Sequence, residues 1–213
     1  MYCCGQCQGI EEVFSEEVVS KELEHYRRRG PRKTTRMLLE AIEDVGVDGL
    51  TLLDIGGGVG AIQHALLSDG VARATCVDAS SAYLSATQSE AKRRGMEEQV
   101  AYHHGNFVDL AAEIYPADIV TLDRVICCYH DMEKLVGLSA ARAKKVYGVV
   151  YPRDRWWAKL VIRLMNFFYR LQKSSYRSFI HPTEAVEAII VHSGLKRRSY
   201  AQTLVWQVVV YTR

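Results

Sequence analysis

The sequence lacks the features that would divide it into separate domains. It contains only four prolines, and it has no long Pro/Gly/Ser linker, internal repeat or low-complexity tract. Its 213 residues, 48% of them hydrophobic, suffice to bury one sizeable core. We therefore expect a single domain over residues 1–213, with a helical cap at 1–48 and a core at 49–213.

Signals for export or membrane insertion are also missing. The first residues show no basic segment followed by an apolar one, so no secretory signal is expected. The six cysteines lack the spacing of a disulfide framework, which indicates a reducing compartment. The most apolar helical stretch, residues 154–172, is too short and too regularly charged to span a bilayer. These absences predict a cytoplasmic protein.

The sequence offers no clear metal site. Cys3, Cys4 and Cys7 have no second Cys or His pair after them to complete a zinc site, so we interpret them as reduced thiols on a frayed terminus. Asp123 and Asp131 enclose a basic, apolar and cysteine-containing segment that suits a hard cation poorly. We expect no metal in the chemistry and activity that survives a chelator.

The most informative segment is the glycine-rich run at residues 54–60, which directly follows the apolar residues 50–53. A buried strand that leaves through glycines into a helix brings backbone N–H groups close to a ligand. The glycine spacing also fits dinucleotide binders. Asp54 argues against them, because its carboxylate would repel a pyrophosphate and would accept hydrogen bonds from an ammonium group.

This segment resembles the first motif of the class I S-adenosylmethionine (SAM)-dependent methyltransferases, in which an acidic residue precedes the glycines. The resemblance implies that Asp54, Gly56, Gly58 and Gly60 bind SAM and that S-adenosylhomocysteine (SAH) is the product. The alternative, a glycine turn without a ligand, is opposed by three further segments.

Each of these segments ends in a polar residue where the family binds its cofactor. Asp78, followed by Ala79, corresponds to the carboxylate that bonds both ribose hydroxyls. Asn106 stands where the family usually has Asp, and its side-chain carbonyl can accept the same bond from the adenine amino group, while Phe107 packs on the purine. Asp123 ends a fourth strand and is expected to border the methionine part.

Alternating apolar and amphipathic stretches predict βαβ units and a mainly parallel sheet. We expect helices at 11–29 and 33–45, then strands at 50–55, 74–78, 99–104, 117–123 and 144–150 alternating with helices at 60–68, 81–94, 108–114, 131–143, 154–172 and 183–193. Residues 196–201 and 204–211 predict a terminal hairpin. The family resemblance implies a Rossmann-like sheet of seven strands with an antiparallel last strand and helices on both faces.

Charge is distributed unevenly along the chain. From Tyr151 onward there are eleven Lys/Arg and three Asp/Glu, whereas the first 150 residues carry a net −6. Within residues 154–172, basic residues recur at helical spacing on a broadly apolar helix. This pattern fits a core helix with snorkelling basic stems, a peripheral membrane contact, or a wall for a large apolar anion. No nucleic-acid-reading module is present.

Two stretches resemble magnesium-protoporphyrin O-methyltransferases in arrangement and in a few residues. They are residues 120–130 and the segment from Tyr151-Pro152-Arg153 through the Trp-rich helix to His181-Pro182. The resemblance implies a pocket for a large anionic or aromatic molecule, with a tetrapyrrole as one candidate.

Methyl transfer needs few catalytic side chains, because the sulfonium of SAM is already activated. We expect Arg124 to hold an anionic acceptor, Tyr129 to orient it and His130 to act as general base. His181 is a second candidate base, and Tyr26 with Arg27–Arg29 is a candidate lid.

The predicted function is methyl transfer from SAM to a small-molecule acceptor, anionic or aromatic. An NAD(P)-dependent oxidoreductase and a non-catalytic SAM-binding protein remain the alternatives. The acceptor, the methylated atom and the oligomeric state do not follow from these residues.

Overall fold

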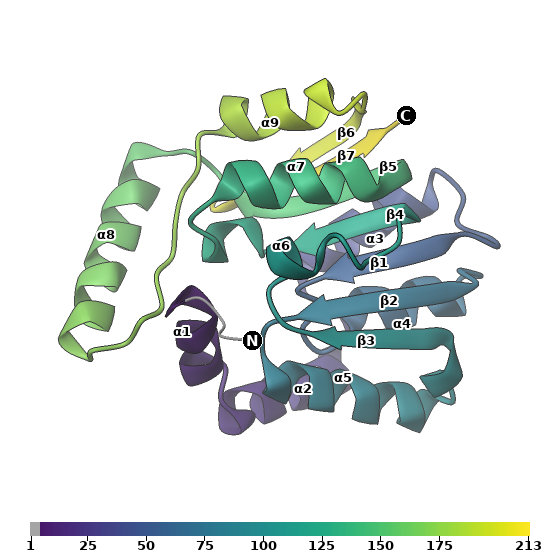
Figure 1. Cartoon of the computed structure of the whole chain (residues 1–213), viewed down its shortest axis with the longest axis horizontal. Coiled ribbons are helices and arrows are strands. Elements are labelled where there is room, and N and C mark those ends of the chain that lie inside the picture. The colour runs from purple at the N-terminus through teal and green to yellow at the C-terminus, as the bar shows by residue number, and fades with distance from the viewer. Residues whose placement is uncertain (1–4) are drawn as a thin grey trace.

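A seven-stranded mixed sheet runs through the middle of the protein, for which the computed structural model describes residues 5–213 (Figure 1). The strands are β1 Thr51–Ile55, β2 Arg73–Asp78, β3 Val100–His104, β4 Ala117–Asp123, β5 Ala143–Pro152, β6 Lys196–Gln202 and β7 Trp206–Thr212. Their order is β3-β2-β1-β4-β5-β7-β6, and β7 runs antiparallel to both of its neighbours, β5 and β6. The predicted fold class is confirmed, including the terminal hairpin.

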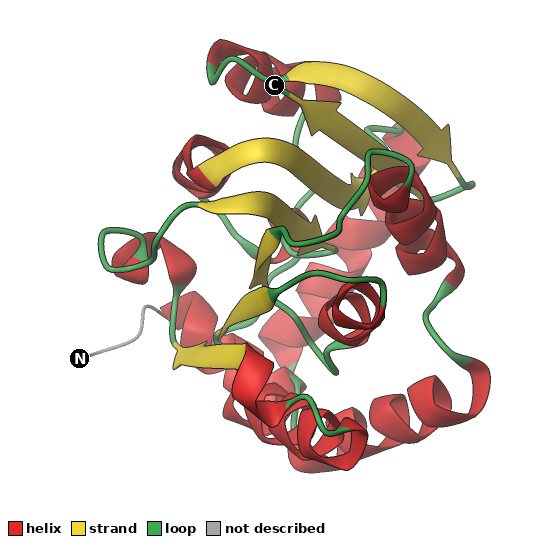
Figure 2. Ribbon diagram, turned by 90° about the vertical axis from the view of Figure 1, so that its right-hand side faces the viewer, coloured by secondary structure: helices red, strands yellow, loops and turns green. Residues whose placement is uncertain are grey.

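Helices precede the sheet and connect its strands. They are α1 Gly5–Val13, α2 Glu16–Arg29, α3 Lys33–Glu43, α4 Ala61–Ser68, α5 Ser81–Arg94, α6 Phe107–Leu110, α7 Met132–Arg142, α8 Trp156–Leu171 and α9 Thr183–His192, with short 3-10 turns η1 Glu97–Gln99 and η2 Ile126–Cys128. The ribbon in Figure 2 shows helices on both sides of the twisted sheet.

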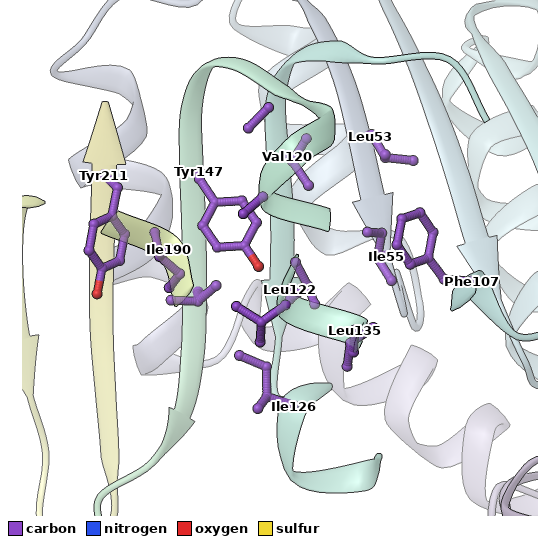
Figure 3. Close-up of a cluster of buried hydrophobic side chains, with 14 of the residues drawn as sticks. Leu53, Ile55, Phe107, Val120, Leu122, Ile126, Leu135, Tyr147, Ile190 and Tyr211 are labelled. Carbon is purple, nitrogen blue, oxygen red and sulfur yellow. The ribbon is translucent and has the colours of Figure 1, made fainter. Parts of the chain in front are cut away.

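Alternate side chains of the buried strands feed two apolar layers, as the strand periodicity of two requires. One layer joins α3, α4 and α5 to the sheet through residues such as Leu38, Leu66 and Leu84. The other joins α6, α7 and α9 to the opposite face, where Ile190 lies near Tyr147 and Tyr211, and Leu135 lies near Leu122 and Ile126 (Figure 3). Because both faces are covered, the carboxyl ends of the parallel strands are left as the natural place for a ligand.

The N-terminal part differs from the prediction of one helix over residues 11–29. The chain forms α1 and α2 with a break at Phe14, and Ser15 has extended backbone at the start of α2. The Phe14 ring packs against Tyr83 at 5.3 Å and against Tyr176 at 6.0 Å between centroids. These contacts come from distant parts of the chain, so local helical periodicity did not reveal the break.

The second helix is fixed to the core by a buried acid. The Glu90 side chain of α5 is fully buried and accepts hydrogen bonds from Arg27 of α2 at 2.8 Å and from Arg93 and Arg94 at 2.6 and 2.8 Å. A buried carboxylate needs such partners to offset its lost hydration. The Arg27–Glu90 ion pair therefore holds the C-terminal end of α2 against α5.

The helix α8 is not a core helix, so that interpretation of residues 154–172 is wrong. Ala158 is its only buried residue, and Figure 1 shows α8 standing at one side of the sheet. Residues 172–182, which we call the return segment, run back from α8 along α1. The Gln6 side chain of α1 donates hydrogen bonds to the carbonyl of Arg177 in this segment at 2.9 Å and to the carbonyl of Cys128 in η2 at 2.6 Å. As a result, α8 stands apart from the sheet and forms one wall of a cavity.

Candidate active site

A cavity of about 550 Å³ opens at the carboxyl ends of β1, β2, β3 and β4. Its floor includes the glycine turn after β1, and its walls come from α1, α2 and α8 together with residues 176–180. Parallel α/β sheets bind ligands at this edge, where the strand order reverses between β1 and β4. The volume lies within the range of small-molecule sites.

The glycine turn brings bare backbone to the cavity for steric reasons. A Cβ on Gly56 would overlap the Val125 side chain, and one on Gly57 would overlap Gln63 and approach the Cys76 sulfur at 2.9 Å. Gly58 has φ +56°, and a Cβ there would meet only the Tyr83 ring, at 3.8 Å. The turn is thus packed tightly against its neighbours at Gly56 and Gly57. It is open at Gly58, which is predicted to approach the cofactor.

Asp54 lies buried at the end of β1 and contributes to the cavity lining. Its Oδ1 accepts a hydrogen bond from the Thr121 hydroxyl at 2.7 Å, and its Oδ2 accepts one from Gln63 at 3.1 Å. Burial raises the pKa of this carboxyl to about 7, although both hydrogen bonds act in the opposite direction. A cationic ligand group would favour the ionised form, so this position suits a cation better than a phosphate.

Asp78 links the second strand to the glycine turn. Its Oδ2 accepts the N–H of Gly58 at 3.0 Å, and its Oδ1 accepts the N–H of Ser80 at 2.9 Å. Burial raises the pKa of Asp78 to about 6 despite these bonds. An ionised carboxylate has about four acceptor positions, so two remain for ligand hydroxyls. Ala79 lines the cavity beside it.

Asn106 has a structural task as well as a place on the cavity wall. Its Oδ1 caps α6 by accepting the N–H of Val108 at 3.1 Å, and its Nδ2 donates to Asp109 at 3.0 Å and to the Tyr129 hydroxyl at 3.1 Å. The cap leaves one lone pair of Oδ1 for an amino group. Phe107 is buried in the core and also reaches the lining.

Asp123 and Arg124 form a charged pair at the end of β4, and both line the cavity. The Arg124 Nε donates to Asp123 Oδ1 at 3.1 Å, while Asp123 Oδ2 accepts from the Thr35 hydroxyl at 2.5 Å. Burial works against the Arg124 cation, but the neighbouring Asp123 and Glu22 hold its pKa above the usual value. Arg124 has φ +62°, a strained conformation for a side-chain-bearing residue that is typical of functional positions.

The two predicted bases, His130 and His181, are not among the residues that line the cavity. His130 is exposed and, like Gly60, is not among the cavity-lining residues. His181 Nε2 lies 3.1 and 2.9 Å from the carbonyls of Ile126 and Tyr129, and burial lowers its pKa. It therefore fastens the return segment to η2. Tyr129 does line the cavity, and its hydroxyl accepts a hydrogen bond from Asn106.

Tyr83 is a cavity residue that was not predicted. Tyr83 donates a hydrogen bond to Glu22 at 2.7 Å and so connects α5 to the N-terminal helices beside Gly58. Trp157, Ile162 and Met165 face the cavity from α8. Their position is the one expected if residues 154–172 form a wall of the pocket, whereas the Tyr83–Glu22 contact has no local sequence signal. Tyr26 lines the cavity as expected of a lid residue, while Arg28 and Arg29 are exposed.

The cysteines fall into two groups. Cys3 and Cys4 lie outside the described residues. Cys7 is buried in α1 rather than on a frayed end, and it lines the cavity with Cys127 and Cys128. Among residues 5–213, no group of three or more His, Cys, Asp or Glu side chains is arranged to hold a metal ion.

The comparisons with known proteins agree with this geometry. Residues 52–145 match the family described as "Methyltransferase domain". Among curated proteins, the chain is 30% identical over 133 residues to ribosomal protein L11 methyltransferase of Alteromonas mediterranea, with 59% of this chain and 46% of that protein covered. The chain thus spans about half the length of the curated relatives it matches.

Solved structures extend the likeness to nearly the whole chain. Magnesium protoporphyrin IX methyltransferase of Synechocystis PCC 6803, with bound SAH, superposes with a TM-score of 0.72 at 14% identity, covering 98% of this chain and 99% of the other. Geranyl diphosphate C-methyltransferase of Streptomyces coelicolor A3(2) gives a TM-score of 0.66 at 12% identity, covering 84% and 77%. At these identities the likeness establishes the fold. Together, the two findings give a methyltransferase domain match over residues 52–145 and the fold of these methyltransferases over nearly the whole chain.

Proposed function

We propose that this chain transfers a methyl group from SAM to a small-molecule acceptor that is anionic or aromatic. The observation that carries the proposal is a single cavity that joins two chemically different halves. Asp54, Gly58 and Asp78 form a polar half at the ends of β1 and β2, and α8 supplies an apolar half that faces it.

The polar half fits SAM. We assign Asp78 to the ribose hydroxyls, Asp54 with Asp123 to the cationic methionine end, and Asn106 with Phe107 to the adenine. When bound, SAM supplies an electrophilic methyl group, and the acceptor's electron pair forms the new bond as the S–C bond breaks. The protein has only to hold the acceptor in line and to allow its proton to leave.

The apolar half fits the acceptor. Trp157, Ile162 and Met165 offer flat and adaptable apolar surface, and Arg124 adds a positive charge at the boundary between the halves. An apolar wall beside a guanidinium group suits an aromatic or otherwise apolar anion. His130 is exposed, so we favour Tyr129, which lines the cavity, as the residue that orients the acceptor.

A protein acceptor is the second candidate, and the name of the curated relatives favours it. The Alteromonas mediterranea relative matches over 59% of this chain and 46% of its own length, so the match alone does not transfer its acceptor to this chain. Enclosure of the cavity by α1, α2 and α8 supports the small molecule instead.

The test is SAH release from SAM with a panel of acceptors: aromatic carboxylates, a porphyrin carboxylate, neutral aliphatic alcohols and amines, and purified ribosomal protein. We expect turnover with the aromatic or anionic small molecules. A neutral aliphatic molecule or the protein as best acceptor would contradict the acceptor assignment, and no turnover with any acceptor despite SAM binding would favour a non-catalytic SAM-binding protein.

A further inference from the structure

The outward face of α8 carries a large group of exposed apolar side chains. They are Trp156, Leu160, Leu164, Phe167 and Leu171, which are between 54% and 78% exposed and which we call the outer stripe. Their spacing of three or four residues places them on one side of the helix. Eight of the fourteen large apolar side chains that are exposed in the described chain lie on α8, so the group is unusually concentrated for a protein surface.

A basic row runs beside the outer stripe. Lys159, Arg163 and Arg170 each directly precede a stripe residue, and all three are exposed. Residues 155–183 contain six Lys/Arg and no Asp or Glu. Lys159 forms an ion pair at 2.6 Å with Asp154, which lies just before the helix. The segment itself contains no acidic residue to neutralise its positive charges.

The opposite face of α8 fixes which way the stripe points. Ile162 and Met165 face the cavity, and Ala158 is buried. Asn166 exchanges hydrogen bonds with the backbone of Ser178 at 2.8 and 2.9 Å, and Tyr169 meets Tyr176 edge-on at 5.3 Å. Since these contacts lock the helix rotation, the outer stripe cannot turn into the core.

We propose that α8 is an interfacial helix that docks the protein on an anionic lipid bilayer. A helix with Trp, Phe and Leu on one face and Lys/Arg beside it lies in the plane of the interface, with its apolar face among the acyl chains. No helix in the described part of the chain is long and apolar enough to cross a membrane, so the contact is parallel to the surface. A second copy of the chain fits the face less well, because two such helices would bring their basic rows together without acids to neutralise them.

The test is co-sedimentation of the whole protein with vesicles of phosphatidylcholine alone or mixed with phosphatidylglycerol. We expect binding to the mixed vesicles, weakened in high salt. Each basic residue near an anionic surface contributes about fivefold in partitioning, so the Arg163→Gln/Arg170→Gln variant should bind about 25-fold more weakly. The exposed pair Lys196→Gln/Arg198→Gln on β6 removes the same charge elsewhere and should bind like the wild type.

The apolar contribution has its own pair of variants. Leu160→Asn/Leu164→Asn should abolish vesicle binding, whereas Val18→Asn/Val191→Asn, at other exposed apolar positions, should leave it unchanged. Circular dichroism confirms that each variant is folded. Three results would overturn the proposal: no binding to anionic vesicles, equal binding to both vesicle types, or a dimer in sedimentation velocity that Leu160→Asn/Leu164→Asn dissociates.

Discussion

Replacing Asp78 by Ala should weaken SAM binding by a predictable amount. The carboxylate lies at the end of β2 with two acceptor positions left after its bonds to Gly58 and Ser80. Loss of a buried partner to ligand hydroxyls costs about 1–3 kcal/mol, which corresponds to a rise in Kd of roughly 5- to 150-fold. Asp78→Asn keeps one acceptor oxygen and should fall between wild type and Asp78→Ala.

The same substitution also affects folding. It removes the acceptor of the Gly58 and Ser80 N–H groups but relieves the burial of a carboxylate whose pKa is raised to about 6. We expect a net loss of about 1–3 kcal/mol in the free energy of unfolding. Asp118→Ala is the matched control, because Asp118 accepts from the Thr51 N–H at 3.1 Å and from its hydroxyl at 2.9 Å at the start of β4, outside the cavity lining.

Calorimetric titration with SAM and urea unfolding separate the two effects. Asp118→Ala should lower stability with an unchanged Kd, and Asp78→Ala should change both. A folded Asp78→Ala protein with wild-type affinity for SAM would refute the ribose assignment.

Three other predictions concern the acceptor, pH and metals. Arg124→Gln should raise the acceptor KM in a steady-state assay with little change in SAM affinity. Arg155→Gln, at an exposed position outside the cavity lining, is the control. Equal acceptor KM values for the Arg124→Gln and Arg155→Gln proteins would exclude Arg124 from acceptor binding. Burial raises the pKa of Asp54 to about 7, so the folded state binds more protons at this group than the unfolded state does below that pH. The contribution of this group to the free energy of unfolding should therefore fall as pH rises from about 4 to 7. Urea unfolding of Asp54→Asn over a series of pH values should lack this contribution. Turnover should survive EDTA, and loss of activity restored by Mg²⁺ would contradict a metal-free reaction.

The sheet and the polar edge of the site were predictable because they depend on local patterns. Apolar runs ending in Asp54, Asp78 and Asp123 identify strands and the edge at which they end, and parallel topology brings those ends together. The cap role of Asn106 was not predicted, and the helix expected at 108–114 is the shorter α6, which begins at Phe107 directly after this residue.

Features that depend on tertiary packing were not predictable. The break between α1 and α2 is set by Phe14 meeting two distant tyrosines, and the exposure of His130 by the course of the chain after η2. The amphipathic pattern of residues 154–172 fits a core helix and a surface helix equally well. The contacts of α8 with residues 176–178 decide between them, because they fix the helix with its outer face exposed.

Calorimetry of the wild-type protein with SAM, SAH and NAD tests the central assignment most directly. The geometry of Asp54, Gly58 and Asp78 predicts saturable binding of SAM and SAH at one site per chain and no binding of NAD. Binding of NAD without binding of SAM or SAH would contradict the account.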